Sequence, residues 1–197
     1  MELIGIISYL PNEQSLREER TELLTNLINK CKRVFPNTDI WVIAQNWKDF
    51  TIDDVTIFSY NKLGINGARQ VLKDKFISSN YDHLIMLDDD CILTMDETDA
   101  KLYLQEIREY PDKAQYFVGR WLKLFSIPKE LYQQIPDFGD SVDEKLINDT
   151  LKELSKNTKQ VYRNFCYPYR QKRSLIINND ATSTYSRDAR LKYFKQI

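Results

Sequence analysis

Three consecutive aspartates, Asp88, Asp89 and Asp90, are the residues of this chain whose type and spacing most directly suggest chemistry. They follow the apolar run at 84–87, which predicts a buried strand. Burying three like charges there would be costly without a cation, and carboxylate oxygens suit Mg²⁺ or Mn²⁺. We therefore expect a metal and a phosphorylated ligand at the triplet, although a solvated acidic turn would explain the same residues.

A second group of residues, 61–70, follows a predicted strand and opens a predicted helix. Gly64 and Gly67 allow the backbone to turn sharply and to approach a ligand closely. The N-terminus of a helix favours anions, and Arg69 lies where it could reach a phosphate or a carboxylate of the aspartate run. An ordinary strand-to-helix turn also fits Gly-x-x-Gly, but the aspartate-terminated strand follows at the spacing of one helix.

Hydrophobic periodicity predicts the elements that position these residues. Apolar runs and helical spacing predict strands at 3–7, 40–44, 55–58, 84–87, 116–118 and 175–177, and helices at 13–35, 64–77 and 98–109. Strands that alternate with helices indicate an α/β fold with a largely parallel sheet. In such sheets ligands bind beyond the carboxyl ends of the strands, which is where the aspartates fall.

Composition is that of an ordinary globular domain, with 197 residues of which 42% are hydrophobic and 29% charged. No apolar run approaches the roughly 20 residues of a membrane span, and no secretory signal is visible, so we expect a cytoplasmic location. Cys31, Cys91 and Cys166 lack metal-ligand spacing and are expected to be reduced. His83 is the only histidine, which excludes histidine-based triads and favours a structural role.

The net charge of −1 conceals an asymmetry along the chain. Residues 1–155 carry 18 Lys+Arg against 27 Asp+Glu, whereas residues 156–197 carry 10 against 2, a net charge of +8. A basic arm on an acidic body suggests a polyanionic partner, although a solvated basic subdomain would have the same composition. The arm also contains aromatic residues that could stack on bases: Tyr162, Phe165, Tyr167, Tyr169 and Tyr185.

The order of these elements and motifs resembles the nucleotide-sugar-binding half of glycosyltransferases with the GT-A fold, close to the family 2 pattern. The resemblance covers residues 3–125, and its most specific parts are the aspartate triplet and the Gly-Ala-Arg segment at 67–69. It implies a Rossmann-like, mostly parallel sheet flanked by helices. Within a single domain, it implies a nucleotide-sugar-binding part at 1–125 and a smaller basic acceptor part at 126–197.

The same resemblance implies a metal-dependent transfer of a sugar from a nucleotide sugar, UDP-glucose foremost, to an acceptor hydroxyl. Its Asp-x-Asp positions match Asp88, which would contact ribose or metal-bound water, and Asp90, which would ligate Mn²⁺ or Mg²⁺ at the diphosphate. A cation and an arginine stabilise the charge that develops on the leaving group. The implied donor pocket comprises Ser8, Tyr9, Asn12, Gly64, Gly67, Arg69, Asp88 and Asp89.

The acceptor half contains no clean match to the family's catalytic base, which is an acidic residue near a helix start. Asp140 and Asp143 are the candidates, because a carboxylate can deprotonate an acceptor hydroxyl when it is correctly placed. Helix N-capping is the ordinary alternative for either residue. A retaining enzyme would need no such base.

A shorter resemblance concerns the acceptor. Residues 7–11, 16–20 and 44–47 are similar to glycosyltransferases of T-even-like bacteriophages, which modify hydroxymethylated cytosine in phage DNA, and this implies a location in the host cytoplasm. The phosphate contacts we then predict come from Arg163, Arg170, Lys172 and Arg173. A pI of about 5.9 argues against DNA binding, and a lipid-linked glycan at a membrane is the competing acceptor.

Two other classes fit the sequence as well. The chain could be a non-catalytic nucleotide- or DNA-binding module, because a fold does not by itself confer activity. A nucleotidyltransferase with two metals would need another carboxylate from a neighbouring strand, and none is evident. Asn179 and Asp180 could return to the metal site as late ligands, although an Asx-type turn explains them too.

Overall fold

The computed structural model describes residues 1–47, 49–89, 91–93, 95–117, 120–138, 150, 162–164 and 176–178. Their elements follow in the order β1 (Glu2–Tyr9), α1 (Gln14–Val34), β2 (Asp39–Gln45), β3 (Thr56–Tyr60), α2 (Gly64–Ile77), β4 (His83–Asp88), β5 (Cys91–Leu93), α3 (Glu97–Glu109), β6 (Ala114–Phe117), β7 (Arg120–Pro128), α4 (Lys129–Tyr132), β8 (Tyr162–Asn164) and β9 (Ile176–Asn178). Each helix and strand that periodicity predicts is present, with ends that differ by at most two residues.

A seven-stranded sheet in the order β3-β2-β1-β4-β7-β6-β8 forms the centre of the molecule. Strands β3, β2, β1 and β4 are parallel, as the sequence predicts, whereas β7 runs antiparallel to both β4 and β6. The sequence does not predict β7, because the residues of this strand, RWLKLFSIP, mix charged and apolar types and form no continuous apolar run. The predicted boundary at residue 125 falls inside this strand.

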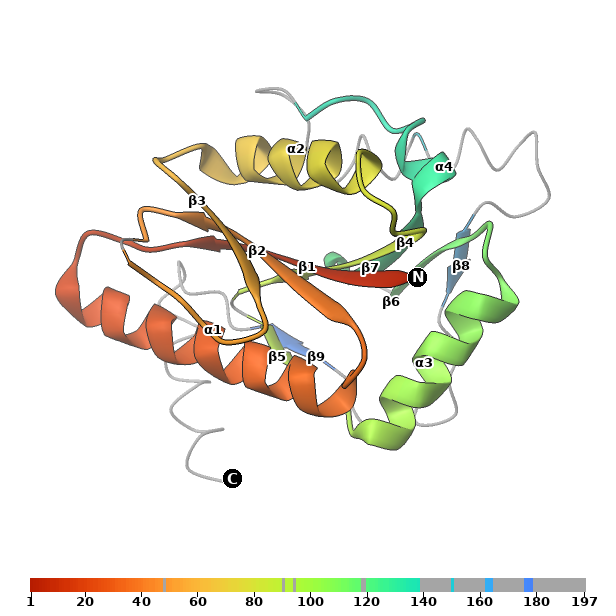
Figure 1. The fold of residues 1–197 in the computed structure, drawn as a ribbon, viewed down its shortest axis with the longest axis horizontal. Coiled ribbons are helices and arrows are strands. Elements are labelled where there is room, and N and C mark those ends of the chain that lie inside the picture. Colours follow the sequence, from red (N-terminus) through yellow and green to blue (C-terminus); the bar gives the residue numbers. More distant parts are fainter. Residues whose placement is uncertain are drawn as a thin grey trace.

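Helices cover both faces of the sheet, with α2 and α4 on one face and α1 and α3 on the other (Figure 1). The core divides in the same way. Ile85 and Leu87 of β4 pack in the cluster under α1 and α3, whereas Leu84 and Met86 pack in the cluster under α2 and α4. Successive side chains of a strand point to opposite faces of the sheet. The residues after Leu87 are therefore expected to face α2 and α1 in turn.

The helices form where local signals favour them. In α1 the buried residues Leu24, Leu27 and Ile28 recur at helical spacing along one face. Helix α3 starts with a reciprocal cap, in which Asp96 accepts from the backbone N–H of Asp99 at 2.9 Å and Asp99 accepts from that of Asp96 at 3.0 Å. None of the described helices is both long and apolar enough to cross a membrane.

Gly5 of β1 allows α2 to pack closely on the sheet. A Cβ atom at this position would lie 2.8 Å from side-chain carbons of both Leu72 and Leu84. Carbon atoms do not approach so closely, so a larger residue would force these two buried side chains to shift between α2 and the sheet. The position of α2 matters because its first turn lies at the carboxyl edge of the sheet.

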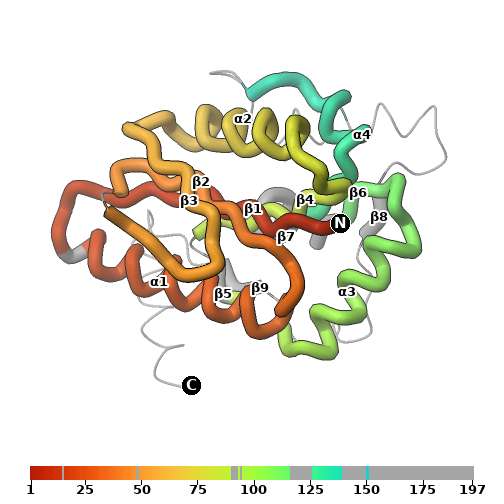
Figure 2. Tube along the Cα trace, in the orientation of Figure 1, coloured from red at the N-terminus to blue at the C-terminus, as the bar shows by residue number. Residues whose placement is uncertain are grey.

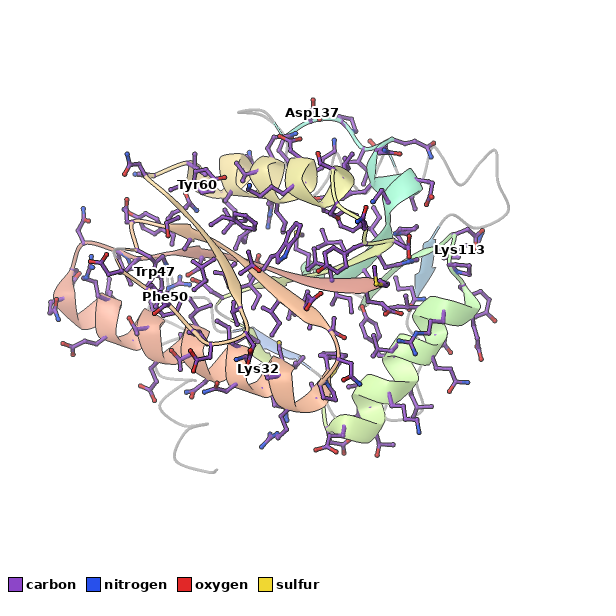
Figure 3. The ribbon with its side chains drawn as sticks, viewed as in Figure 1. Lys32, Trp47, Phe50, Tyr60, Lys113 and Asp137 are labelled. Atoms are coloured by element: carbon purple, nitrogen blue, oxygen red, sulfur yellow. The ribbon has the colours of Figure 1, made fainter. Side chains whose placement is uncertain are left out.

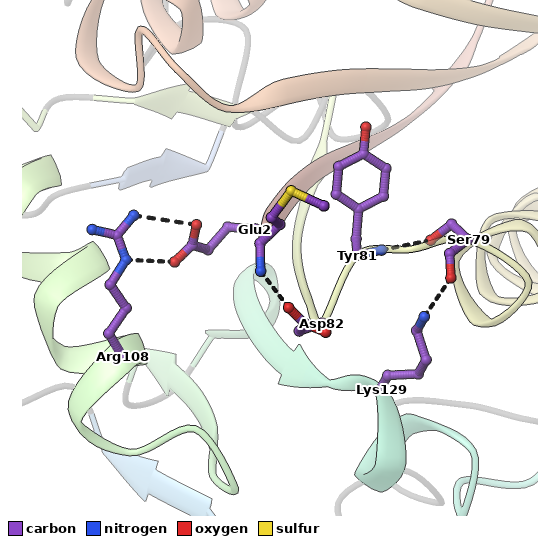
Figure 4. A network of polar contacts seen from close by, with 7 residues as sticks. Glu2, Ser79, Tyr81, Asp82, Arg108 and Lys129 are labelled. Atoms are coloured by element: carbon purple, nitrogen blue, oxygen red, sulfur yellow. Dashed lines mark hydrogen bonds and ion pairs between the residues drawn. The ribbon is translucent and has the colours of Figure 1, made fainter.

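Polar contacts secure the opposite edge, where the parallel strands begin (Figure 4). Arg108 of α3 donates two hydrogen bonds to the Glu2 carboxylate, 2.7 and 3.2 Å long, and these bonds lower the pKa of that carboxyl. Lys129 donates to the carbonyl oxygen of Ser79 at 2.6 Å. These contacts join α3 and the turn after α2 to the ends of the strands.

His83, the first residue of β4, is expected to make the free energy of unfolding depend on pH. Burial lowers the pKa of its imidazole from the ordinary value of 6.5, so the unfolded chain takes up a proton at a higher pH than the folded protein does. The contribution of His83 is therefore complete above about pH 6.5 and is lost as the pH falls below it. We expect His83→Gln to flatten the pH dependence of unfolding by urea between about pH 5 and 7. Equal slopes for the two proteins would contradict this assignment.

Candidate functional site

The carboxyl ends of the parallel strands meet at one edge of the sheet. The register pairs Ile7 with both Ile43 and Asp88, and it pairs Tyr9 with Gln45. The end of β1, which continues into the predicted nucleobase loop, therefore lies beside the aspartates at the end of β4. Two segments that are about eighty residues apart in the sequence form a common surface.

Asp89 faces α1 and is only 5% exposed. Its Oδ2 accepts a hydrogen bond from the Ser8 hydroxyl at 2.6 Å and one from the backbone N–H of Tyr9 at 3.4 Å. Its Oδ1 is paired with Nη1 of Arg20 at 2.5 Å. The indole N–H of Trp47 donates to the Ser8 oxygen at 3.1 Å, which extends the chain of contacts to the loop after β2. We call Ser8, Arg20, Trp47 and Asp89 the Asp89 network.

The ring of Trp47 also packs against Phe50, with ring centres 4.4 Å apart, and Figure 3 shows the two side by side near α1. Trp47 is thereby fixed on both its polar and its apolar side. The Asp89 network therefore joins β1, α1, the loop after β2 and the aspartate run into one unit.

Asp88 faces the other side of the sheet, toward α2. Its Oδ1 lies 3.9 Å from Nη2 of Arg69, which is an ion pair but too long for a hydrogen bond. Arg69 is 4% exposed, and its Nε has no hydrogen-bond partner among the described residues. Buried donors are almost always satisfied, so this nitrogen marks a place for an acceptor that a ligand could supply.

Helix α2 begins beside this pair. Gly64, its first residue, has a φ of 72°, in the left-handed region that favours glycine. The N-cap residue, Leu63, provides no side-chain cap for the helix; instead its backbone N–H donates to Oε1 of the buried Gln45 at 2.8 Å. Gln45 thus fixes the turn that presents the first amides of α2 at the carboxyl edge, where they favour an anion. Gly67 lies in the same first turn.

The segment after α4 runs along α2 toward the same edge, and Figure 2 shows it passing over the helix. The buried Lys73 donates to the carbonyl oxygen of Ile135 at 2.7 Å and to Asp137 at 2.8 Å. Farther toward the start of α2, Oε1 of Gln70 accepts from the backbone N–H of Phe138 at 2.6 Å. The Lys73 ammonium lowers the pKa of the Asp137 carboxyl. The chain at Phe138 is therefore heading toward the turn that carries Arg69.

Several predicted site residues fall outside the described residues: Asp90, Asp140, Asp143, Arg170, Lys172, Arg173, Asn179 and Asp180. Arg163 is described only as part of the backbone of β8. Asn12 is exposed in the loop after β1. Within the described ranges no three potential ligands cluster as a metal site.

Strand β9 brings the basic arm beside the aspartate run. It pairs antiparallel with β5, and the register places Asn178 opposite Cys91. Cys91 directly follows Asp90 in the sequence. Residues 176–178 of the C-terminal part of the chain therefore pair with the strand that directly follows the aspartate run in the sequence.

Sequence reasoning assigned no role to Arg20, Gln45 or Trp47. All three lie in the short segments at 16–20 and 44–47 that the sequence analysis compared with phage enzymes, and this overlap is a signal that could have drawn attention to them. Helical periodicity could not, because Arg17 and Arg20 both read as polar positions of α1.

No protein-family model matches the sequence, and no curated protein matches it. Several solved structures are similar. A Bacillus anthracis protein assigned as a glucose-1-phosphate thymidylyltransferase, solved with sucrose, has a TM-score of 0.61 at 11% identity, over 96% of this chain and 93% of that one. A cytidylyltransferase from Leptospira borgpetersenii has a TM-score of 0.56 at 13% identity, over 90% and 81% of the two chains.

A mannosyltransferase from Pyrobaculum calidifontis, solved with GDP-Man and Mn²⁺, has a TM-score of 0.57 at 14% identity, over 85% of this chain and 54% of that one. Both nucleotidyltransferases and glycosyltransferases are therefore among the similar structures. At these identities the likeness establishes the fold alone: the chain has the α/β architecture of these three structures.

The Asp89 network predicts unequal effects for two arginines of α1. Arg20→Met would leave the buried Asp89 carboxylate without its cation, and we expect a loss of roughly 3 kcal/mol in the free energy of unfolding. Arg17→Met, the matched control, removes one hydrogen bond of 3.2 Å to the Pro11 carbonyl and should cost about 1 kcal/mol or less. Adding Asp89→Asn to Arg20→Met should recover part of the loss. Equal losses for Arg17→Met and Arg20→Met in urea unfolding would refute this reading of the network.

Proposed function

We propose that the chain is a metal-dependent glycosyltransferase that moves a sugar from a nucleoside-diphosphate sugar, such as UDP-glucose, to an acceptor hydroxyl. The observation that carries the proposal is the Asp88–Arg69 pair at the carboxyl edge. There the Nε of a buried guanidinium has no hydrogen-bond partner among the described residues, beside the first turn of α2. A diphosphate would provide an acceptor for this nitrogen and a negative charge that the N-terminus of a helix favours.

The residues then divide by task. We assign Tyr9 and Asn12 to the nucleobase and ribose, and we assign Arg69 with the first turn of α2 to the diphosphate. We assign Asp89 a structural task in the site, because its carboxylate already accepts from Ser8 and Arg20.

We assign the cation to Asp88 and Asp90. Mg²⁺ is usually bound by one or two carboxylates together with substrate phosphates and water, so its site requires no preformed cluster of three protein ligands. When bound, Mn²⁺ or Mg²⁺ would neutralise charge that develops on the departing diphosphate. We propose Asp140 or Asp143 as the base, which agrees with the direction in which the chain runs at Phe138.

A nucleotidyltransferase is the second candidate, because two structures named for that activity match most of both chains. A nucleoside triphosphate is commonly cradled by successive backbone N–H groups of a glycine-rich loop. The loop between β1 and α1, residues 10–13, has no glycine and contains Pro11, which has no N–H. This loop favours a diphosphate sugar over a triphosphate as the substrate.

For the acceptor we propose hydroxymethylcytosine in DNA. The three short segments that resemble the phage enzymes contribute Ser8, Arg20 and Trp47 to one network, so the resemblance falls on residues that are linked through Ser8 and Asp89. The pairing of β9 with β5 also agrees with a basic arm that guides a polyanion to the aspartate edge. A lipid-linked glycan is the competing acceptor.

Replacing Arg69 tests the donor pocket. Arg69→Met keeps an unbranched buried side chain but removes the charged donor, and we expect the affinity for UDP-glucose with Mn²⁺ to fall by at least about tenfold. Arg108→Met is the control, because Arg108 lies at the other edge of the sheet and should leave binding unchanged. Isothermal titration calorimetry on folded variants measures both. Unchanged binding by Arg69→Met would assign Arg69 a purely structural role.

The products of the reaction test the activity. We expect labelled glucose to pass from UDP-glucose to hydroxymethylcytosine DNA. Release of pyrophosphate from UTP and glucose 1-phosphate would instead favour the nucleotidyltransferase. Transfer to a lipid-linked acceptor alone would overturn the DNA assignment and leave the glycosyltransferase standing. Metal-independent nucleotide binding without turnover of either kind would favour a non-catalytic module.

The salt dependence of DNA binding tests separately whether the basic arm contacts phosphates. Phosphate contacts release counterions, so affinity should fall steeply as salt rises. Replacing two of Arg163, Arg170, Lys172 and Arg173 with glutamine should flatten the salt slope by roughly two units. An unchanged slope would remove these residues from the acceptor site.

A further inference from the structure

An open groove of about 770 Å³ lies between the C-terminal end of α2 and the amino halves of β2 and β3. We infer that this groove is a saccharide-binding site, distinct from the proposed donor pocket. Side chains that carry the argument line it: Asp39, Trp41, Phe58, Asp74, Lys75 and Tyr81.

The aromatic side chains form a fixed surface. Trp41 meets Phe58 edge to face, with ring centres 5.4 Å apart, and meets Tyr81 in the same way at 5.5 Å. All three are half-buried and pack against the core cluster under α2. Each has few rotatable bonds, so little conformational entropy is lost when a ligand packs on it. The C–H face of a pyranose is apolar and matches such a surface.

The carboxylates of the groove are oriented in advance. Oδ2 of Asp39 accepts from the Tyr81 hydroxyl at 2.5 Å, and Oδ1 of Asp74 accepts from the Gln70 amide at 2.7 Å. Burial and the neighbouring Asp39 raise the pKa of Tyr81 to about 12, so its hydroxyl remains a donor at neutral pH. An ionised carboxyl offers about four lone-pair positions, which leaves capacity for sugar hydroxyls at both aspartates.

The charges favour a neutral saccharide over a cation or a nucleotide. Nζ of Lys75 lies 3.9 Å from the centre of the Phe58 ring, so the protein's own ammonium already takes the cation–π position. Lys75 would repel a cationic ligand from the Phe58 face, and Asp39 and Asp74 would repel the phosphates of a nucleotide. Charges of both signs therefore border the groove, and neither a cation nor an anion is favoured by all of them. Sugar hydroxyls can donate to the carboxylates and accept from the ammonium at the same time.

The inference does not depend on the proposed activity. Asp39 pairs with Leu3 near the start of β1, whereas Asp88 pairs with Ile7 near its end. The groove therefore opens toward the amino ends of the strands and includes none of the residues assigned to the donor. It could hold a longer glycan, or a glycosylated partner, whether or not the aspartate edge is catalytic.

Saturation-transfer difference NMR with maltohexaose, cellohexaose and chitohexaose tests the groove in the intact protein. We expect saturable binding of at least one hexasaccharide, weakened at least about fivefold by Trp41→Leu. Because Trp41 is half-buried, the exposed Asp74→Ala provides a second variant that should weaken binding without disturbing the core. Asp112→Asn, an exposed aspartate outside the groove, should bind like the wild type.

Three outcomes would overturn the proposal. One is that none of the three hexasaccharides binds. Another is that binding is unchanged in folded Trp41→Leu and Asp74→Ala, which would place the sugar elsewhere. The third is that tetramethylammonium or UDP binds in place of the sugars and that Trp41→Leu abolishes this binding. The groove would then bind a cation or a nucleotide and not a saccharide. None of these outcomes bears on turnover of UDP-glucose at the aspartate edge.

Discussion

Two adjacent carboxylates at the end of β4 leave the strand on opposite faces, and each meets an arginine from the helix that covers that face. Asp89 meets Arg20 of α1 at 2.5 Å, and Asp88 meets Arg69 of α2 at 3.9 Å. Without these arginines, two ionised carboxylates at neighbouring, nearly buried positions would repel each other and would be costly to bury. The alternation of a β-strand thus assigns one aspartate to each layer of the domain.

The two carboxylate–arginine pairs differ in the contacts that the described residues make with them, and this difference distinguishes the two faces of the edge. On the α1 side the carboxylate is engaged with Arg20 and Ser8, and Trp47 closes the chain of contacts. On the α2 side the ion pair is long, and Nε of Arg69 has no hydrogen-bond partner among the described residues. Gln45 and the close packing at Gly5 hold the first turn of α2 beside this pair. The α1 face of the edge is therefore closed by contacts within the protein, and the α2 face is the one for which we propose an anion.

Much of this fold can be predicted from the sequence, because the central parallel strands are continuous apolar runs and the helices are long and periodic; α2 begins and ends at the predicted residues. The proximity of Arg69 to the aspartates was also predictable, since a strand, a turn and a helix fix the edge at which they lie. The role of Arg20 was not. Periodicity marks a residue as polar but cannot indicate which polar residue of α1 reaches a carboxylate on another strand. Likewise, the mixed pattern of β7 hides an antiparallel strand that only pairing with β4 reveals.

The division of the two aspartates between the layers has an evolutionary consequence. Positions 20 and 89 form one closed pair, so a lineage that loses either charge should lose the other, and both could be replaced together by a well-packed neutral pair. Under the proposed function, positions 69 and 88 also contact the ligand, so they should change only when the chemistry changes. In a set of diverging descendants the first pair would then covary, while the second would stay constant or disappear with the activity. Independent variation at positions 69 and 88 would instead indicate that both carboxylates serve only the architecture.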